Sequence, residues 1–187
     1  MNFNEIKISV VIPVLNGEKT IRRCLESVIS QTLKEIEILV VDAKSEDNTE
    51  NIVKEFINKD GRIHRIISEN RSYGYQVNLG IRMASGEYIG ILEPDDTIKP
   101  DMYERLFETA VKAGTEEIVM DYIKGSYEEI ERETGNRKYR RVETDLQPDV
   151  VAIWSGIYKR TFLEENGIFL NETPGASFQD SGFHLLA

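Results

Sequence analysis

The chain has 187 residues, of which 40% are hydrophobic and 30% are charged, and its formal net charge is −10. These values are typical of one globular domain, and the acidic balance argues against a nucleic-acid-binding surface, which needs clustered lysine and arginine. The single cysteine excludes an internal disulfide bond, and the lack of a long apolar run or a basic signal segment makes the cytosol the expected compartment.

The first expected strand covers residues 7–14, which are rich in β-branched residues and barely alternate between apolar and polar. This pattern is typical of a central parallel strand that is buried on both faces. Pro13 is expected to end its pairing, because proline has no N–H to donate, and Asn16-Gly17 then provides a turn. Apolar residues at helical spacing predict an amphipathic helix over 18–31, with the single cysteine on its buried face.

Strand and helix patterns then alternate up to residue 92. Strands are expected over 36–41, 63–67 and 88–92, and helices after the capping residues Asp47-Asn48-Thr49 and over 73–83. Parallel strands that are joined by crossover helices place helices on both faces of the sheet. The sequence therefore predicts an α/β fold with a mainly parallel central sheet.

Three carboxylates, Glu93, Asp95 and Asp96, surround Pro94 directly after the fourth expected strand. Ligands bind at the carboxyl ends of strands in open α/β sheets. Two adjacent carboxylates repel by up to about 4 kcal/mol at an effective dielectric of 20, and a divalent cation with a preference for oxygen ligands would remove that cost. An isolated acidic pair is more often a solvated turn before a helix, so the surrounding motifs must decide between the two interpretations.

The second half begins with a helix that Pro100-Asp101 is expected to open and Gly114 to end, followed by a strand over 117–122. Residues 124–145 carry opposite charges on the two sides of a Gly-Asn turn, which predicts an inserted, exposed β-hairpin.

A short helix is expected over 161–166, and a polar loop then leads to Asp180. The last residues have the pattern of an unfinished helix, so we expect a catalytic domain cut from a longer protein.

Five segments form an ordered set of motifs, namely 10–17, 24–32, 38–42, 86–89 with 93–96, and 178–180. In this order and spacing they resemble the family-2 glycosyltransferases of the GT-A fold. The resemblance covers nearly the whole chain except the charged hairpin. It implies one Rossmann-like α/β/α domain over 1–187, with a nucleotide-binding half (1–97) and an acceptor and catalytic-base half (98–187).

The resemblance also implies an activity. It is inverting, metal-dependent transfer of a sugar from a nucleotide-diphospho-sugar, in the first place a UDP-sugar, to a hydroxyl of a saccharide or lipid-linked saccharide acceptor. Mn2+ or Mg2+ is the implied cofactor. Surface polysaccharide synthesis in bacteria is the implied setting, which adds peripheral association with the inner face of the cell membrane to the expectation.

The resemblance implies that five positions contribute to nucleotide binding. Pro13 and Asn16 would shape the wall of the base pocket, and Asp42 would accept the N3–H of uracil. Asp42 has a second interpretation, as a cap for the turn that follows its strand. Asn70 and Arg71 would lie at the edge of the base or the diphosphate, and their second interpretation is a solvated loop.

The remaining implied roles concern the diphosphate, the metal and the base catalyst. Asn78 occupies a helix position where family members carry Asn, although Val77 replaces the Arg that often precedes it. Asp95 would bind the ribose hydroxyls and Asp96 the metal, assisted by Glu93, which stands where the family usually has Asp. Asp180 would take the proton from the acceptor hydroxyl as general base, and its alternative role is a helix N-cap.

Three other classes of protein compete with this interpretation. A nucleotide-sugar-binding module without turnover stays open as the alternative. A dinucleotide-dependent oxidoreductase is excluded because the turn after the first strand supplies one glycine. A P-loop enzyme is excluded because no Gly-Lys-Ser/Thr motif is present.

Overall fold

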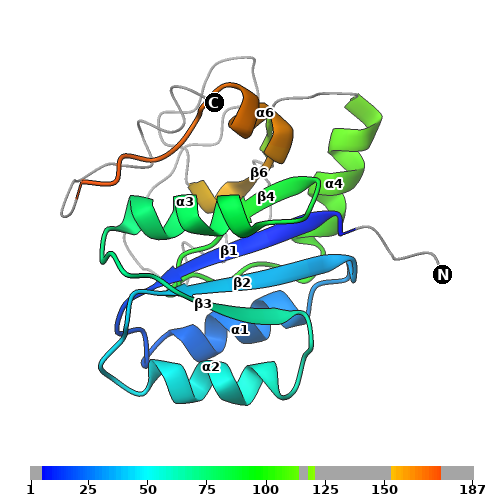
Figure 1. Ribbon diagram of the computed structural model, residues 1–187. Coiled ribbons are helices and arrows are strands. Elements are labelled where there is room, and N and C mark those ends of the chain that lie inside the picture. Colours follow the sequence, from blue (N-terminus) through cyan, green and yellow to red (C-terminus); the bar gives the residue numbers. More distant parts are fainter. Residues whose placement is uncertain (1–5, 114–117, 121–152, 174–187) are drawn as a thin grey trace, which may run out of the picture.

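The computed structural model describes residues 6–113, 118–120 and 153–173, and Figure 1 shows their arrangement. In chain order the elements are β1 (Ile8–Val14), α1 (Ile21–Ile29), β2 (Ile36–Asp42), α2 (Thr49–Ile57), β3 (Ile63–Ile67), α3 (Tyr73–Met83), β4 (Tyr88–Ile91), α4 (Met102–Ala113), β5 (Ile118–Met120), the 3-10 helix η1 (Ile153–Ser155), β6 (Gly156–Lys159) and α6 (Arg160–Glu165). In the described part of the chain, no helix has the length and apolar character that crossing a membrane requires.

The strands form one six-stranded sheet in the order β3-β2-β1-β4-β6-β5. The first four strands in this order are mutually parallel, β6 runs antiparallel to β4, and β5 runs antiparallel to β6. Helices α1 and α2 lie on one side of the sheet and α3 on the other (Figure 1). This arrangement confirms the predicted three-layer α/β/α fold with a mainly parallel sheet.

Strand β1 has apolar side chains on both faces because each face is covered by helices. Val10 and Ile12 belong to the larger core cluster, to which α1, α2 and α4 contribute. Val11 belongs to the second cluster, with Val77 and Ile81 of α3. Successive side chains of a strand point to opposite faces, so burial on both sides explains the continuous apolar run in the sequence.

Pro13 lies inside β1, so the prediction that it ends the pairing was wrong for one of the two neighbouring strands. The pairing with β2 continues through Pro13 to Val14, whereas the pairing with β4 ends at Val11. Val11 accepts from the Leu92 N–H on the β4 side and Val14 accepts from Ala43 on the β2 side. Backbone groups alternate between the two neighbours along a parallel strand. The proline nitrogen therefore faces β4, beyond the last pair, where no donor is needed.

Other element boundaries differ from the predictions at their ends. The first helix was expected over 18–31, but the chain before α1 forms a turn in which the Thr20 and Ile21 N–H groups both donate to the Gly17 carbonyl. The helix predicted over 161–166 is α6, and Gly167 follows it with a φ of +62°. The hairpin predicted over 124–145 lies outside the described residues.

A buried glutamate joins the start of β4 to strands β1 and β2. The Glu37 carboxylate on β2 accepts from the Ser9 hydroxyl (2.5 Å) and from the N–H and hydroxyl of Ser85 (2.7 and 2.8 Å). The Ser9 hydroxyl in turn accepts from the Gly86 N–H (2.8 Å). These bonds fix where the chain enters β4, and so fix the position of the residues at the other end of that strand.

Gly86→Ala is expected to lower the free energy of unfolding by about 1–3 kcal/mol, because an added Cβ has no space. It would lie 2.6 Å from the Ser9 nitrogen and 2.9 Å from the Ile8 carbonyl carbon, which are backbone atoms of the central strand. Chemical denaturation measures the change. Gly61→Ala is the matched control, since a Cβ there meets nothing within 4 Å. Equal stability of the two variants would contradict the close packing of Gly86 on β1.

Candidate active site

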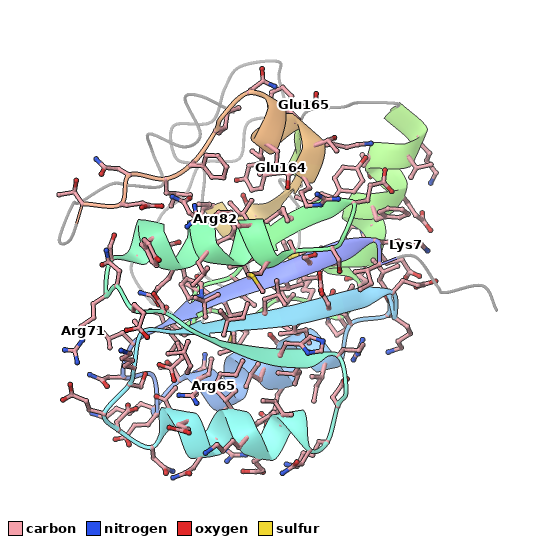
Figure 2. All side chains as sticks on the ribbon, in the orientation of Figure 1. Lys7, Arg65, Arg71, Arg82, Glu164 and Glu165 are labelled. Atoms are coloured by element: carbon pink, nitrogen blue, oxygen red, sulfur yellow. The ribbon has the colours of Figure 1, made fainter. Side chains whose placement is uncertain are left out.

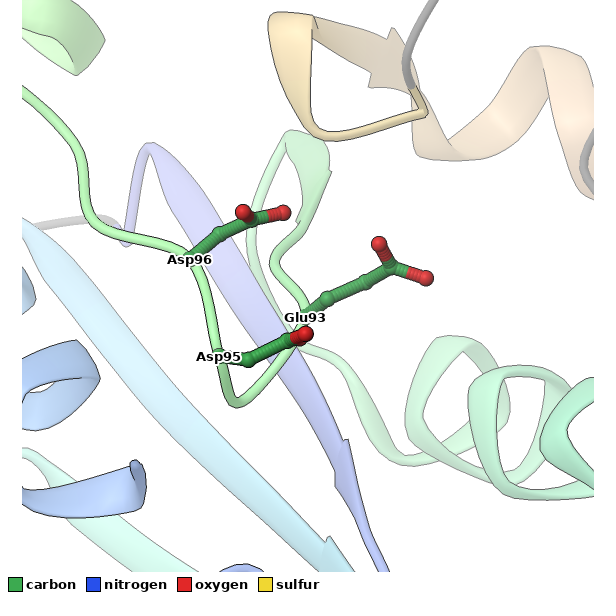
Figure 3. Close-up of side chains that lie close together, drawn as sticks. All are labelled: Glu93, Asp95 and Asp96. Carbon is green, nitrogen blue, oxygen red and sulfur yellow. The ribbon is translucent and has the colours of Figure 1, made fainter. Parts of the chain in front are cut away.

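Three carboxylates gather where the chain leaves β4. After the Leu92 N–H donates to the Val11 carbonyl (3.0 Å), a tight turn follows in which the Asp96 N–H donates to the Glu93 carbonyl (3.1 Å). Glu93, Asp95 and Asp96 each offer a carboxylate oxygen, and these oxygens lie within 4.8 Å of one another. The three side chains extend to the same side of the turn (Figure 3). We call these three residues the acidic trio.

The acidic trio suits a divalent cation such as Mn2+ or Mg2+ by its donor set. All three candidate ligands are carboxylate oxygens, which hard cations prefer. Glu93 and Asp96 are half-buried and Asp95 is exposed, so one side of the cluster is open to a ligand that brings further oxygen atoms. A cation there would also relieve the repulsion between three neighbouring negative charges.

The single cysteine lies behind the acidic trio and does not take part in it. Cys24 is fully buried, and its thiol donates to the backbone carbonyl of Glu93 (3.6 Å). Burial raises the pKa of the Cys24 thiol, and the negative charges of Asp96 and Asp95 raise it further. The thiol therefore stays protonated, which is a poor state for binding a metal, and its place in the core is the one that the sequence predicted.

An open hollow of about 750 Å3 adjoins the acidic trio. It is lined by residues from three loops, namely Leu15, Asn16, Gly17, Glu18, Lys19, Thr20, Glu46, Asp47, Pro94 and Asp95. The β1–α1 loop, the β2–α2 loop and the turn after β4 meet here because all three leave the carboxyl ends of parallel strands. Among the described residues that were predicted as site residues, Asn16 and Asp95 line the hollow. Pro13 lies in β1, immediately before the loop that forms one wall.

Two of these loops are joined by hydrogen bonds from backbone N–H groups to side chains. The β1–α1 loop donates from Asn16 to the Ser45 hydroxyl (2.9 Å), from Gly17 to Thr49 Oγ1 (2.8 Å) and from Glu18 to Asp47 Oδ2 (2.9 Å). In the reverse direction, the Glu46 N–H donates to Asn16 Oδ1 (2.8 Å). Asn16 has a φ of +55°, which asparagine tolerates better than most residues. We call this set of bonds the loop lock.

The loop lock includes residues that the sequence did not identify as part of the site. Asp47-Asn48-Thr49 was predicted to cap α2. Asn48 is the N-cap and makes no side-chain capping bond, while Asp47 accepts from the Thr49 N–H (3.0 Å). The other carboxylate oxygen of Asp47 accepts from the Glu18 N–H in the β1–α1 loop, a contact that the capping pattern did not predict. Burial acts to raise the pKa of Asp47, but the hydrogen bonds from Thr49 and from the Glu18 N–H lower it below its usual value.

Asp42, the last residue of β2, is fully buried behind the hollow. Its Oδ1 accepts from the N–H and the hydroxyl of Ser45 (2.8 and 2.7 Å), and its Oδ2 accepts from Arg65 Nε and Nη2 (3.0 and 2.5 Å). Arg65 extends from β3 towards α2 (Figure 2), where its Nη1 also pairs with Glu50 (3.1 Å). The capping role that the sequence left open for Asp42 is therefore present.

Arg71 lies at the rim of the hollow, on the loop before α3. Its exposed guanidinium pairs with Glu46, which lines the hollow, and Figure 2 shows it extending away from the sheet. Asn70 holds the same loop, because its Oδ1 accepts from the N–H of Ser72, the N-cap of α3 (2.9 Å). Arg71 is thus within reach of the hollow but engaged with a carboxylate.

Asn78 has a structural role in this fold. Its Nδ2 donates to the Leu170 carbonyl and to Glu172 Oε1 (2.9 Å each), and its Oδ1 accepts from the Leu170 N–H (2.9 Å). These bonds fasten the segment after α6 onto α3, and they use both amide hydrogens of the side chain. The contacts give no support to the prediction that Asn78 binds the nucleotide. Asp180, the predicted general base, lies outside the described residues.

Residues 9–178 match the protein family described as Glycosyl transferase family 2. Glycosyltransferase GlyG of Streptococcus pneumoniae serotype 4 is 36% identical over 147 residues, which are 78% of this chain and 47% of that protein. The chain thus spans less than half the length of this relative.

Two solved structures are similar in fold. Residues 1–349 of TarS from S. aureus in complex with UDP-GlcNAc superpose with a TM-score of 0.75 at 22% identity, over 95% of this chain and 52% of that one. The mannosyltransferase PcManGT from Pyrobaculum calidifontis, in complex with GDP-Man and Mn2+, gives a TM-score of 0.69 at 19% identity, over 92% of this chain and 50% of that one. At these identities the likeness is one of fold.

Proposed function

This chain belongs to glycosyl transferase family 2, and from that premise we propose that it catalyses inverting, metal-dependent transfer of a sugar from a UDP-sugar to an acceptor hydroxyl. The observation that carries the proposal is the acidic trio at the edge of the open hollow. A divalent cation can hold the diphosphate of a nucleotide, and a hollow next to that cation can take the nucleoside. The two features occur together at the carboxyl ends of the strands, where open α/β sheets bind ligands.

The proposal gives a task in donor binding to six of the predicted residues. Asp96 and Glu93 hold the cation, which when bound neutralises the charge that grows on the departing diphosphate. Asp95 belongs to the acidic trio and also lines the hollow. Its carboxylate accepts hydrogen bonds from the ribose hydroxyls. Asn16 forms the wall for the base, with Pro13 behind it, and Arg71 at the rim binds phosphate oxygens once it leaves Glu46.

Asp180 completes the proposed mechanism from the C-terminal part of the chain. Its carboxylate takes the proton of the acceptor hydroxyl while that oxygen attacks the anomeric carbon from the side opposite the diphosphate. The C–O bond to the diphosphate breaks in the same displacement. One displacement inverts the anomeric centre, so a second catalytic carboxylate is not required, unlike in glycoside hydrolysis.

The donor class is supported by the ligands of the two fold neighbours. TarS binds UDP-GlcNAc, and PcManGT binds GDP-Man with Mn2+. Their shared chemistry is a sugar on a nucleoside diphosphate, and we choose UDP because it is the nucleotide of the neighbour with the higher TM-score. We propose a saccharide or lipid-linked saccharide as acceptor, in surface polysaccharide synthesis at the inner face of the cell membrane.

Calorimetric titration of UDP, GDP and CDP, with and without Mn2+, tests the donor site. We expect the Kd for UDP to be at least about tenfold lower with Mn2+ than after its removal by EDTA, because a cation held by Asp96 and Glu93 would supply positive charge for the diphosphate. Slow hydrolysis of a UDP-sugar in the same solution distinguishes an enzyme from a binding module without turnover. Failure of all three nucleotides to bind in the presence of Mn2+ would overturn the proposed function.

A further inference from the structure

The ion pair between Arg65 and Asp42 lies behind the hollow, and its hydrogen bonds indicate what it does there. Asp42 is fully buried, and the Arg65 side chain is 15% exposed. The pair does not line the hollow, but its neighbours on the β2–α2 loop do. The inference below rests on the proposed function, because it concerns how the nucleotide site is held in shape.

The carboxylate of Asp42 is already saturated with hydrogen bonds. An ionised carboxylate offers about four lone-pair sites. Ser45 occupies two of them on Oδ1 through its N–H and hydroxyl, and Arg65 occupies two on Oδ2 through Nε and Nη2. A nucleotide base that donated to Asp42 would have to displace one of these donors and leave it unpaired in a buried place, which is unfavourable.

The same hydrogen bonds connect the ion pair to the wall of the hollow. The Ser45 hydroxyl donates to Asp42 and accepts from the Asn16 N–H (2.9 Å), and Asn16 lines the hollow. A continuous chain of contacts therefore runs from Arg65 through Asp42 and Ser45 to Asn16. Both Arg65 nitrogens bond to Oδ2 and both Ser45 donors bond to Oδ1, so each oxygen of the carboxylate is held by one partner. Because charge-assisted hydrogen bonds are strong, the guanidinium helps to fix the position of the Ser45 hydroxyl.

We infer that Asp42 and Arg65 are positioning residues, which act through Ser45 to hold Asn16 in place in the wall of the nucleotide site, and that Asp42 does not bind the base. This replaces the expectation that Asp42 accepts the N3–H of uracil. The pair acts on any nucleotide that uses the wall, whichever base it carries. Selection among bases then belongs to residues that line the hollow directly.

The test compares UDP with CDP in Asp42→Asn and Arg65→Met, because N3 donates in uracil and accepts in cytosine. In both variants we expect the Kd values of the two nucleotides to rise by the same factor, about tenfold, so that their ratio stays at its wild-type value. The inference would be overturned if Asp42→Asn raised the Kd of UDP but not that of CDP while Arg65→Met bound UDP normally. Asp42 would then be the base acceptor.

A matched control comes from a second Asp–Arg pair at the opposite end of β3. Asp60 and Arg62 lie 2.6 Å apart, before the strand begins. Asp60→Asn is expected to lower the melting temperature without changing the Kd of either nucleotide. If it weakened nucleotide binding as much as Asp42→Asn does, the effect would be general loss of stability, and the positioning role would be refuted.

Hydrogen exchange of the Asn16 amide tests the inference without any nucleotide. Its N–H bonds to the Ser45 hydroxyl, so exchange in Asp42→Asn, Arg65→Met and Ser45→Ala should be about tenfold faster than in wild type and in Asp60→Asn. Unchanged exchange in the first two variants would refute the chain of contacts. A wild-type protein that binds no nucleotide would refute the proposed function alone, since this readout still decides the structural claim.

Discussion

Asp96→Asn is expected to lower sugar transfer in the presence of Mn2+ by about 10² to 10³, comparable with the loss of a group that stabilises charge in a transition state. An amide keeps the size of the side chain but removes its negative charge, so the trio loses the ligand that the proposal places on the cation. UDP binding should become nearly independent of Mn2+ in the variant. Initial rates of transfer or hydrolysis across a Mn2+ titration measure the effect.

Two further variants make this result specific. Glu93→Gln should show a smaller loss, because a longer side chain can also act through a bridging water. Glu108→Gln, on the exposed face of α4, removes the same charge away from the trio and should leave the rate at its wild-type value. Equal Mn2+ dependence of UDP binding in Asp96→Asn and wild type would remove the metal-binding role from Asp96.

Asp180→Asn is expected to lower the rate of transfer strongly while donor binding is retained. General-base catalysis contributes about 10² to 10⁴ in rate, and an asparagine cannot take the acceptor proton. We therefore expect kcat to fall within that range while the Kd for UDP in Mn2+ stays as in wild type. The acidic limb of the pH–rate profile, which reports the protonation of the base, should disappear.

The neighbouring residue provides the control for this variant. Gln179→Ala alters the same segment without touching the proposed base, and its kcat should stay near that of wild type. Normal turnover by Asp180→Asn would eliminate Asp180 as the base. A parallel loss of UDP binding in that variant would assign Asp180 to donor binding instead of proton transfer.

The elements of the first half could be predicted from the sequence because their signals are local. The predicted ranges of β3 and α3 agree with Ile63–Ile67 and Tyr73–Met83, since apolar spacing and nearby turn residues define both ends. Proline at position 13 shows the limit of such local rules. A proline removes a donor on one side of a strand, and only the sheet order shows that β4 no longer pairs there.

The acidic trio could be predicted for a similar reason, since its three carboxylates lie within four positions of the chain. The loop lock could not, because its partners, such as Asn16 and Ser45, are 29 positions apart. Their contact exists only once β1 and β2 are paired in register. The bonds from Arg65 to Asp42 likewise depend on the neighbouring strand β3, so the sequence alone left two roles open for Asp42.

The most direct test of the account is a crystal structure of the protein grown with Mn2+ and UDP. The prediction is an anomalous difference peak for manganese among the carboxylates of Glu93, Asp95 and Asp96, with the two phosphates of UDP beside it and the uridine in the hollow. A nucleotide bound elsewhere on the sheet, or a bound UDP with manganese at a site that none of these three residues touches, would contradict it.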